Sequence, residues 1–473
     1  MAVRLISMAS EIDVETKSAK IPRVKGIPFV GSTVEMAKDP AAFFVRAYRD
    51  YGPVYQVNVF GRKQYCIAGV EAAKLMSTKK GRDGLRSKEF WQDFVDHFGA
   101  SKTLTQIDGE EHRKMRGIMR KGFSREAAAG QYHMLTEIGD KSITRDWKTG
   151  ETVPVVEAFQ YMIVQMIGEM MSGDAPLDYV KDIRTNILFL LNTLVARVRP
   201  KIMLQSPKFK KASKRVDELG EKLIAQFKAY ADSGELPDNL LGDVYQAHID
   251  DPEFVQARDL AVLLTGPYVA GLDTVANSVA AATYGILKTP GVLEKVQAEA
   301  DALYAKDTVT EADIRGLTYI QNCLKEAMRI WPIAVAQMRT TNHDLEFEGH
   351  IIPKDELIFI GTSVPHFMEE YFPDPYKFDP DRFSDERREH MKPGVYAPFG
   401  RGPHSCLGQN LAEVLMGVIM ARLFHRLDLS LESPDYVLKT KTAPTPGPAM
   451  SFSVKVNGER HPAKPLIPEV LEE

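Results

Sequence analysis

Apolar residues at the spacing of an α-helix dominate the chain between about residues 70 and 330. Between 333 and 383, and again over 443–456, the sequence becomes strand-like and is punctuated by prolines. We therefore predict a mainly α protein in which separated parts of the chain contribute small β-sheets. The helical pattern is illustrated by one apolar stripe flanked by lysines, formed by Val216, Leu219, Leu223 and Phe227.

Two shorter elements precede the helical region. The stretch 41–52 predicts a short amphipathic helix that ends at Gly52. Residues 53–69 predict a β-hairpin, because strand-forming residues lie on both sides of the turn at 60–62. For the whole chain we expect a flexible segment over 1–20, a single domain over 21–460 and a tail over 461–473.

Composition excludes several classes of protein. The 473 residues include 60 Lys and Arg and 64 Asp and Glu, and the resulting net charge of −4 gives no general attraction to nucleic acid or anionic lipid. We find no signal sequence and no transmembrane anchor at the N-terminus, and we expect a cytoplasmic protein. The three cysteines Cys66, Cys323 and Cys406 include no C-x-x-C pair, which argues against a disulfide framework, a zinc ribbon and an iron–sulfur cluster.

One long helix is predicted over 259–290, about 45 Å in length, and it must run through the interior. Ala270 and Gly271 have little side-chain bulk, so we expect a group other than protein to lie against the helix there. Asp273 and Thr274 place a carboxylate and a hydroxyl beside this gap, which suits proton delivery. The alternative is a threonine bonded back to its own helix and an aspartate in a salt bridge.

A second helical segment carries a candidate buried ion pair. Glu326 and Arg329 lie three positions apart on one face, among apolar neighbours. A buried pair needs further hydrogen bonds to offset its desolvation, and Arg382 is a candidate third member. The alternative is an ordinary exposed pair on a helix surface.

The last cysteine, Cys406, lies among glycines directly before another predicted helix. Free N–H groups and the positive dipole end at a helix N-terminus favour thiolate over thiol. Gly400, Gly402 and Gly408 permit positive φ and the close approach of a flat ligand. An unpaired thiolate in this position is a good axial metal ligand. The alternatives are a nucleophilic cysteine assisted by His404 and an inert buried thiol.

The segment 399–408, FGRGPHSCLG, resembles the haem-binding loop of the cytochrome P450 family of haem-thiolate monooxygenases. The usual pattern of that loop is F-x-x-G-x-[RH]-x-C-x-G, and every fixed position is filled here. The resemblance implies that the cysteine is the thiolate ligand of the haem iron. The matching residues are Phe399, Gly402, His404, Cys406 and Gly408, with histidine where arginine is commoner.

Other segments resemble motifs of the same family in the same order. The sequence AGLDT is similar to the oxygen-activation motif, which implies that Asp273 and Thr274 act as acid and alcohol. Glu326, Arg329 and Arg382 resemble the family's structural triad.

A third motif concerns the haem propionates. Residues 109–124 resemble the helix that binds them, which implies roles for His112 and Arg116, and Arg339 matches a third propionate contact. The similarity spans roughly residues 22–456. It implies the cytochrome P450 fold, with haem buried between a long central helix and the cysteine loop.

The resemblance also implies an activity. Haem b would bind noncovalently, since the chain has no C-x-x-C-H attachment site. The enzyme would use dioxygen and two external electrons to hydroxylate a lipophilic small molecule, such as a terpenoid, steroid, fatty acid or aromatic. NAD(P)H would supply the electrons through a separate ferredoxin or flavodoxin and its reductase. The alternatives are a peroxide-driven peroxygenase or isomerase, and a noncatalytic haem sensor.

Two surfaces are expected to serve this activity in a monomeric protein. A basic stripe invites an acidic electron donor, although a solvated helix face is the alternative. Its residues are Arg113, Lys114, Arg120 and Lys121. By resemblance and composition, an apolar substrate pocket is expected to include Leu263, Ala270, Ile333, Val335 and Pro448, with 186–204 as a candidate mobile lid.

Overall fold

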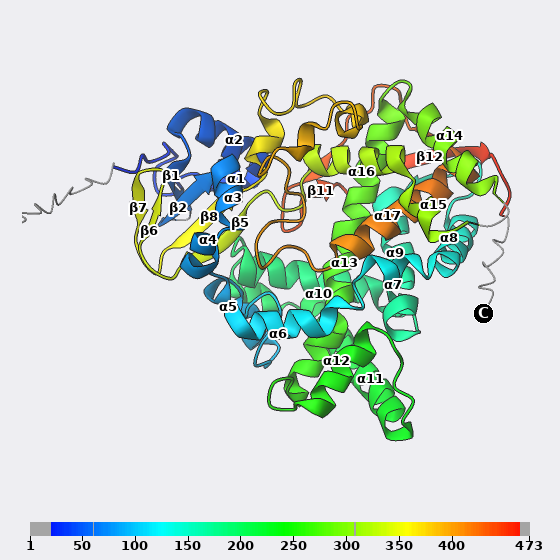
Figure 1. The fold of residues 1–473 in the computed structure, drawn as a ribbon, viewed down its shortest axis with the longest axis horizontal. Coiled ribbons are helices and arrows are strands. Elements are labelled where there is room, and N and C mark those ends of the chain that lie inside the picture. Colours follow the sequence, from blue (N-terminus) through cyan, green and yellow to red (C-terminus); the bar gives the residue numbers. More distant parts are fainter. Residues whose placement is uncertain (1–19, 60, 307–308, 464–473) are drawn as a thin grey trace, which may run out of the picture.

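The computed structural model describes residues 20–59, 61–306 and 309–463, and helices dominate this part of the chain (Figure 1). The predicted mainly α fold with small sheets is confirmed. Of the segments predicted to flank the fold, residues 1–19 and 464–473 lie outside the described part. The α-helices are α1 Thr33–Lys38, α2 Pro40–Tyr51, α3 Val70–Leu75, α4 Lys79–Gly84, α5 Lys88–His97, α6 Gly109–Arg120, α7 Arg125–Ala129, α8 Tyr132–Asp146, α9 Val155–Ser172, α10 Val180–Leu190, α11 Pro207–Ser233, α12 Leu240–Asp250, α13 Ala257–Lys288, α14 Val292–Tyr304, α15 Glu311–Arg315, α16 Thr318–Ile330 and α17 Gln409–Arg426.

Short helical turns of other types connect these helices. One of them, η2, is a π-helix that continues α10 and lies inside the segment predicted as a lid. The turns are η1 Leu177–Tyr179, η2 Leu191–Val195, η3 Lys201–Gln205, η4 Val364–Phe367, η5 Pro380–Phe383 and η6 Glu389–Met391.

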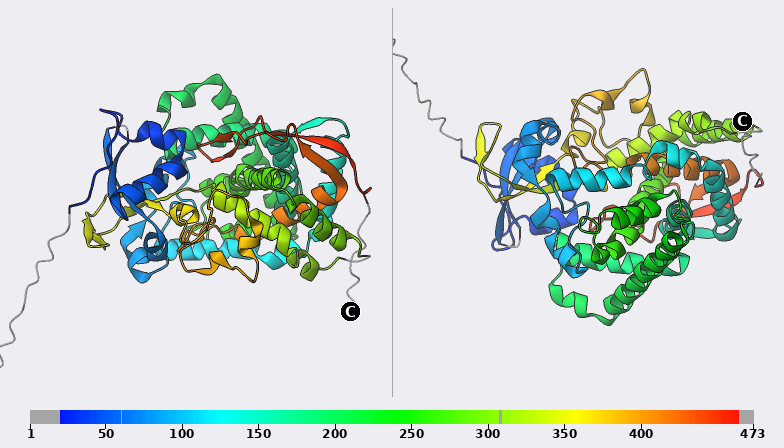
Figure 2. Two further views of the ribbon diagram at one scale, coloured as in Figure 1. Left: turned by 90° about the horizontal axis from the view of Figure 1, so that it is seen from above. Right: turned by 60° about the horizontal axis from the view of Figure 1, so that its bottom comes forward.

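A five-stranded sheet lies at one end of the molecule in all the views (Figures 1 and 2). Its strands, in spatial order, are β1 Val54–Val59, β2 Arg62–Ala68, β8 Leu357–Gly361, β5 Gln337–Thr341 and β3 Leu85–Arg86. The predicted hairpin forms one edge, where β1 and β2 run antiparallel with Val54 opposite Ile67. Because β8 pairs with β2, the second half of the chain returns to the N-terminal part.

Three smaller sheets also join distant segments. The order β4–β12–β9 brings the C-terminal strand beside two others, at the end of the molecule opposite the five-stranded sheet (Figures 1 and 2). The remaining pairs are β6 with β7 and β10 with β11. The bounds are β4 Thr152–Pro154, β6 Leu345–Phe347, β7 His350–Ile352, β9 Leu427–Leu431, β10 Thr440–Lys441, β11 Gly447–Pro448 and β12 Ser453–Glu459.

Helix α13 is the predicted long central helix. It runs for 32 residues, and a capping box between Gln256 and Asp259 satisfies backbone donors at its start. Most of its side chains are buried, because α9, α11, α16 and α17 pack around it. The predicted apolar stripe of α11 is also buried, which explains why that helix lies along the same core. None of the helices among the described residues has both the length and the apolar composition of a membrane-spanning segment.

Candidate active site

The loop before α17 has a shape that depends on two glycines. The backbone N–H of Cys406 donates to the carbonyl of Phe399 at 2.9 Å, which closes the loop. Gly400 and Gly402 have φ of 71° and 79°, in the left-handed region that favours glycine. A Cβ on Gly402 would also lie 2.2 Å from the carbonyl oxygen of Met76. A larger residue there would force the loop to move.

The third glycine of the predicted pattern has a different role. Gly408 has φ of −82° and is the N-cap of α17, so it does not need positive φ. A Cβ there would make ordinary contacts of 3.6 Å with the ring of Phe123. Gly408 therefore does not use the positive φ that glycine permits, unlike Gly400 and Gly402.

Cys406 is exposed as a residue, whereas Cys66 and Cys323 are buried. Burial of the sulfur by the surrounding protein nevertheless raises the pKa of Cys406, although the N–H of Gly408 and the charge of Arg116 oppose this effect. The helix terminus alone does not outweigh desolvation, contrary to the expectation from the sequence. A bound metal cation is the partner that would hold this sulfur as a thiolate.

One stripe of α13 is not covered by protein. Ala270 is exposed, and Gly266 and Thr274, one turn away on either side, are partly exposed in a mostly buried helix. A Cβ on Gly266 would meet nothing within 4 Å. Gly271 differs from the expectation, because its Cβ position lies 2.6 Å from a methyl carbon of Ile167. Gly271 therefore permits close packing of α13 on α9, and the open space lies along the other three residues.

The carboxylate of Asp273 is buried in a polar cluster built from three other elements. Its Oδ1 accepts a hydrogen bond from Nε2 of Gln160 on α9 at 2.6 Å and lies 3.4 Å from Nε of Arg184 on α10. Its Oδ2 lies 3.3 Å from Nζ of Lys441 on β10. Burial lowers the pKa of Lys441, and the charge of Asp273 partly offsets that effect. Sequence spacing gives no sign of these partners, because they come from distant segments.

The hydroxyl of Thr274 donates to the carbonyl of Ala270 at 2.8 Å. Both contacts of the alternative interpretation, a back-bonded threonine and an ion-paired aspartate, are thus present. Thr274 nevertheless lies on the uncovered stripe, so its oxygen can accept a further hydrogen bond. Thr265, which lies earlier on the same helix, donates in the same way to the carbonyl of Ala261 but is buried.

Two predicted propionate contacts are buried polar groups with unfilled hydrogen-bonding capacity. Nε2 of His112 is buried and has no hydrogen-bond partner in the described part of the chain. Burial lowers the pKa of the Arg339 guanidinium to about 10. This guanidinium contacts the carbonyl of Met338 at 2.6 Å and the amide oxygen of Gln337 at 3.5 Å, and no carboxylate of the described residues forms an ion pair with it. Both groups therefore suit a bound anion.

The third predicted contact, Arg116, and the loop residue His404 already have partners. Nε2 of His404 lies 2.8 Å from Oδ1 of Asp108, and its ring packs on that of His112 with centroids 4.1 Å apart. Burial opposes ionisation of Asp108, but the hydrogen bond with His404 lowers its pKa overall. Arg116 donates to the carbonyl of Ser405 at 2.8 Å, which ties α6 to the cysteine loop. Asp108 is a polar member of this cluster that no sequence motif indicated.

The structure brings Glu326, Arg329 and Arg382 together in the interior. Glu326 and Arg329 are fully buried, and Arg329 donates to both carboxylate oxygens at 2.7 and 2.8 Å. Arg382 lies 3.2 Å from the same carboxylate. Arg329 also donates to the carbonyl of His366 at 2.6 Å, so the cluster holds η4 and η5 against α16.

The five predicted substrate-pocket residues divide into two groups. Ala270 is exposed and Ile333 partly exposed, whereas Leu263, Val335 and Pro448 are covered by protein. Val335 belongs to a smaller apolar cluster with residues of the N-terminal part. A surface hollow of about 690 Å³ between α8, α9 and α10 contains none of the five and is lined largely by charged side chains.

The predicted basic stripe on α6 is mostly neutralised by acids of the same chain. Its four cations are exposed, and three of them form ion pairs. The pairs are Arg113 with Glu110, Lys114 with Asp251 and Lys121 with Asp238. The local net charge of this set is therefore 4 − 3 = +1, which is weaker than the sequence suggests.

The structure combines a long central helix that has an uncovered stripe with a cysteine loop that is shaped by glycines, and both features suit an enzyme that holds a flat cofactor. The family model described as Cytochrome P450 matches residues 22–450. The chain therefore belongs to the cytochrome P450 family, and it is a cytochrome P450 monooxygenase.

Relatives from distant organisms agree with this assignment. The chain is 24% identical to the putative cytochrome P450 120 of Synechocystis, over 91% of this chain and 95% of the relative. It is 22% identical to the lanosterol 14-alpha demethylase of Bos taurus, over 86% and 82% of the two chains. The solved structure of a retinoic acid-bound cyanobacterial CYP120A1 has the same fold, with a TM-score of 0.79, 23% identity and coverage of 93% and 99%.

Proposed function

We propose that the chain hydroxylates a lipophilic small molecule, with electrons passed from NAD(P)H by a separate ferredoxin or flavodoxin and its reductase. The observation that carries the proposal is the pair His112 and Arg339. Both are buried polar groups that form no ion pair or hydrogen bond with an acid among the described residues, although the charge of Asp108 acts on both from a distance. A flat cofactor that carries two carboxylates would give His112 and Arg339 an anionic group to bind.

The residues present fit haem b. Cys406 would hold its iron, and His112 and Arg339 would hold its propionates, assisted by His404 and Arg116. When bound, haem supplies the oxidising chemistry that inserts an oxygen atom into an unactivated C–H bond. Gly400 and Gly402 shape the loop so that its backbone can approach the plane of such a group.

Proton delivery is assigned to Thr274 and Asp273. The Thr274 hydroxyl faces the uncovered stripe, where it can hold a water molecule by accepting or donating a hydrogen bond. Arg184 and Lys441 orient the carboxylate of Asp273, so that it can take up a proton and pass it through water toward Thr274.

Electron donors are expected to dock with little electrostatic steering. The cations of α6 leave a local net charge of only +1 after their internal ion pairs are counted, as four cations minus three acids. We therefore expect a shallow dependence of turnover on salt. A steep loss of activity with rising salt would contradict this part of the proposal.

The substrate class follows from apolar surroundings and from the named relatives. Retinoic acid, bound to CYP120A1, and lanosterol, named in the demethylase, are both lipophilic. The α13 stripe and the partly exposed Ile333 offer this protein's substrate an apolar surface. Terpenoids, steroids, fatty acids and aromatics are the classes to be tested.

The experiment is a screen of such compounds against the haem-loaded enzyme for a shift in the spin state of the iron. Hits are then incubated with dioxygen, NAD(P)H and a ferredoxin or flavodoxin system, and in parallel with peroxide alone. Hydroxylated product that requires the electron system supports the proposal. Product formed with peroxide only would identify a peroxygenase, and hits without product in either arm would identify a ligand-binding haem protein.

A further inference from the structure

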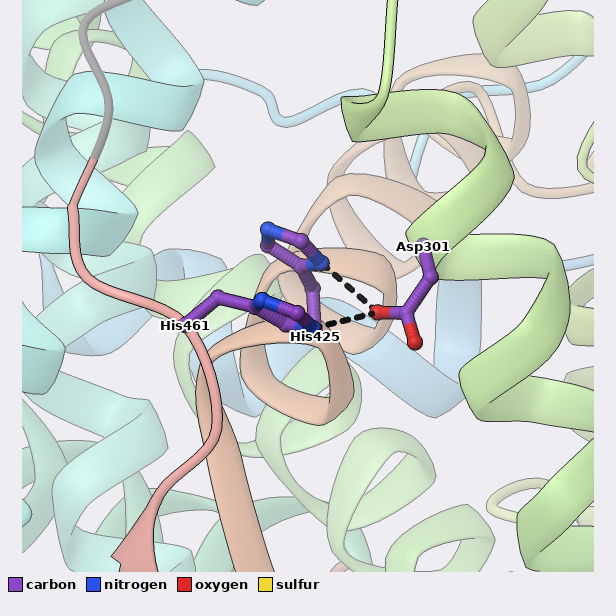
Figure 3. A group of neighbouring side chains, drawn as sticks. All are labelled: Asp301, His425 and His461. Atoms are coloured by element: carbon purple, nitrogen blue, oxygen red, sulfur yellow. Dashed lines mark hydrogen bonds and ion pairs between the residues drawn. The ribbon is translucent and has the colours of Figure 1, made fainter.

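Three side chains with metal-binding atoms meet where α14, α17 and the segment after β12 come together (Figure 3). These elements lie at the end of the molecule opposite the five-stranded sheet (Figure 1). Asp301 comes from α14, His425 from the last turn of α17, and His461 from the segment after β12. Oδ1 of Asp301 lies 2.7 Å from Nδ1 of His425 and 3.5 Å from Nε2 of His461. The three candidate ligand atoms all lie within 4.8 Å of one another.

The carboxylate is held so that one oxygen faces the two imidazoles. Arg460 donates to Oδ2 of Asp301 at 2.7 Å and, more weakly, to Oδ1 at 3.2 Å, and it is itself anchored on the carbonyl of Phe424 at 2.6 Å. A supporting hydrogen bond of this kind orients a ligand carboxylate. His425 is buried, whereas the side chain of His461 is 45% exposed, so the cluster opens to solvent on one side.

We infer that Asp301, His425 and His461 form a binding site for a divalent transition-metal ion, and that Zn²⁺ matches it best. Two imidazole nitrogens and one carboxylate oxygen suit zinc, whereas Mg²⁺ and Ca²⁺ prefer oxygen ligands. Three protein ligands leave a fourth position for water in a tetrahedral site.

Binding requires a small rearrangement that the structure allows. With bonds of about 2.0–2.1 Å, tetrahedral ligand atoms lie about 3.3 Å apart. The separation of 3.5 Å between His461 and Asp301 already fits, while the hydrogen bond of 2.7 Å between His425 and Asp301 must lengthen. The two rings stack at 4.4 Å with 9° between their planes, and one ion cannot lie in both planes at once. The exposed His461 ring must turn, while Arg426 holds its backbone carbonyl at 2.9 Å.

Surrounding charges neither attract nor repel the ion strongly. Three acids and three arginines form the ion pairs around the cluster, so their charges cancel. They are Asp301, Asp140 and Glu459, with Arg460, Arg422 and Arg426. The affinity must then come from the three ligand bonds, and removing one ligand should weaken binding sharply.

The site lies far from the oxygen chemistry. Helix α17 has 18 residues, or about 27 Å at 1.5 Å per residue, and it separates His425 from the loop that carries Cys406. The ion would tie the C-terminal segment after β12 to α14 and α17. Its presence does not depend on the substrate or the electron donor proposed above.

Zinc binding is tested on the haem-loaded enzyme, in which iron already occupies Cys406, after removal of other metals by dialysis against a chelator. Equilibrium dialysis with Zn²⁺ should give one zinc per chain for the wild type. His343→Ala, which removes an exposed histidine elsewhere, is the matched control and should bind equally. His461→Ala should lower the affinity at least about tenfold, and His461→Cys, which offers another zinc ligand, should restore it.

Two further readouts identify the ligands. X-ray absorption at the zinc edge should show nitrogen and oxygen neighbours at about 2.0–2.1 Å. Zinc should also raise the thermal midpoint of the wild type and of His343→Ala but not of His461→Ala. The inference is overturned if the wild type binds only traces of zinc, or if His461→Ala binds zinc as tightly as the wild type. Either result would show that the three side chains only form hydrogen bonds with one another and do not bind a metal ion.

Discussion

Replacing Glu326 with glutamine tests how far a buried ion cluster stabilises the fold. The carboxylate accepts from Arg329 at 2.7 and 2.8 Å, from Arg382 at 3.2 Å and from the backbone of Asp379 at 3.0 Å, and it is fully buried. Glutamine keeps the size but removes the charge, and its amide N–H groups would face other donors. Arg382 keeps an ion pair with Glu389 at 3.0 Å, whereas Arg329 keeps only carbonyl partners. Breaking a buried pair in this way costs about 3–5 kcal/mol.

The loss is measured as a shift in the thermal midpoint of the haem-loaded protein, followed by haem absorbance and circular dichroism. An unfolding entropy of about 2.1 cal/mol/K per residue over 473 residues gives about 1 °C per kcal/mol, so Glu326→Gln should lower the midpoint by about 3–5 °C. The control is Asp381→Asn on the turn η5, next to Arg382; its ion pair with Lys295 is exposed and contributes at most about 1 kcal/mol. Equal midpoints for Glu326→Gln and Asp381→Asn would refute the reasoning.

Three further predictions concern proton delivery and pH. Thr274→Ala should divert much of the consumed NAD(P)H into hydrogen peroxide. Thr265→Ala loses the same type of helix bond at a buried position and should still use NAD(P)H for product; equal peroxide yields from the two variants would argue against a role for Thr274. Asp273→Asn should lower oxygen-dependent turnover about 100-fold while the substrate affinity from the spin-state titration stays the same, and unchanged turnover would exclude it as the acid. Burial lowers the pKa of His366 to about 3, and its Nε2 accepts from the N–H of Ala397, so the folded protein holds this ring neutral. An unfolded histidine binds its proton near pH 6.5, so protonation favours the unfolded state below that pH. The neutral ring therefore contributes fully to the free energy of unfolding above pH 6.5. That contribution is lost as the pH falls from 6.5 toward 3, by about 2 kcal/mol at pH 5. His366→Gln should remove that part of the acid sensitivity of the thermal midpoint, and identical pH profiles for the two proteins would contradict the assignment.

Local patterns predict the elements of this fold well. The hairpin β1–β2, the long helix α13 and the apolar face of α11 each follow from the spacing of residues within one segment. The pair of Glu326 and Arg329 is visible for the same reason, because i and i+3 share a helix face. The π-helix η2 could not be predicted, because it interrupts an otherwise regular apolar helix.

Features that depend on contacts between distant segments could not be predicted from local sequence patterns. The partners of Asp273 on α10 and β10 meet it only after folding. The pKa of Cys406 was predicted from its helix terminus, but burial by other elements has the opposite effect and is larger. The sequence pattern predicts room for a ligand at Gly271 and Gly408, whereas Gly271 permits close helix packing and Gly408 caps a helix.

The central claim is that the sulfur of Cys406 binds the haem iron. The most direct test is the spectrum of the reduced, carbon monoxide-bound protein after reconstitution with haem. We expect the red-shifted Soret band of a thiolate-ligated haem in the wild type and in the controls Cys66→Ala and Cys323→Ala, and its loss in Cys406→Ala. A thiolate-type spectrum that persists in Cys406→Ala would contradict the account.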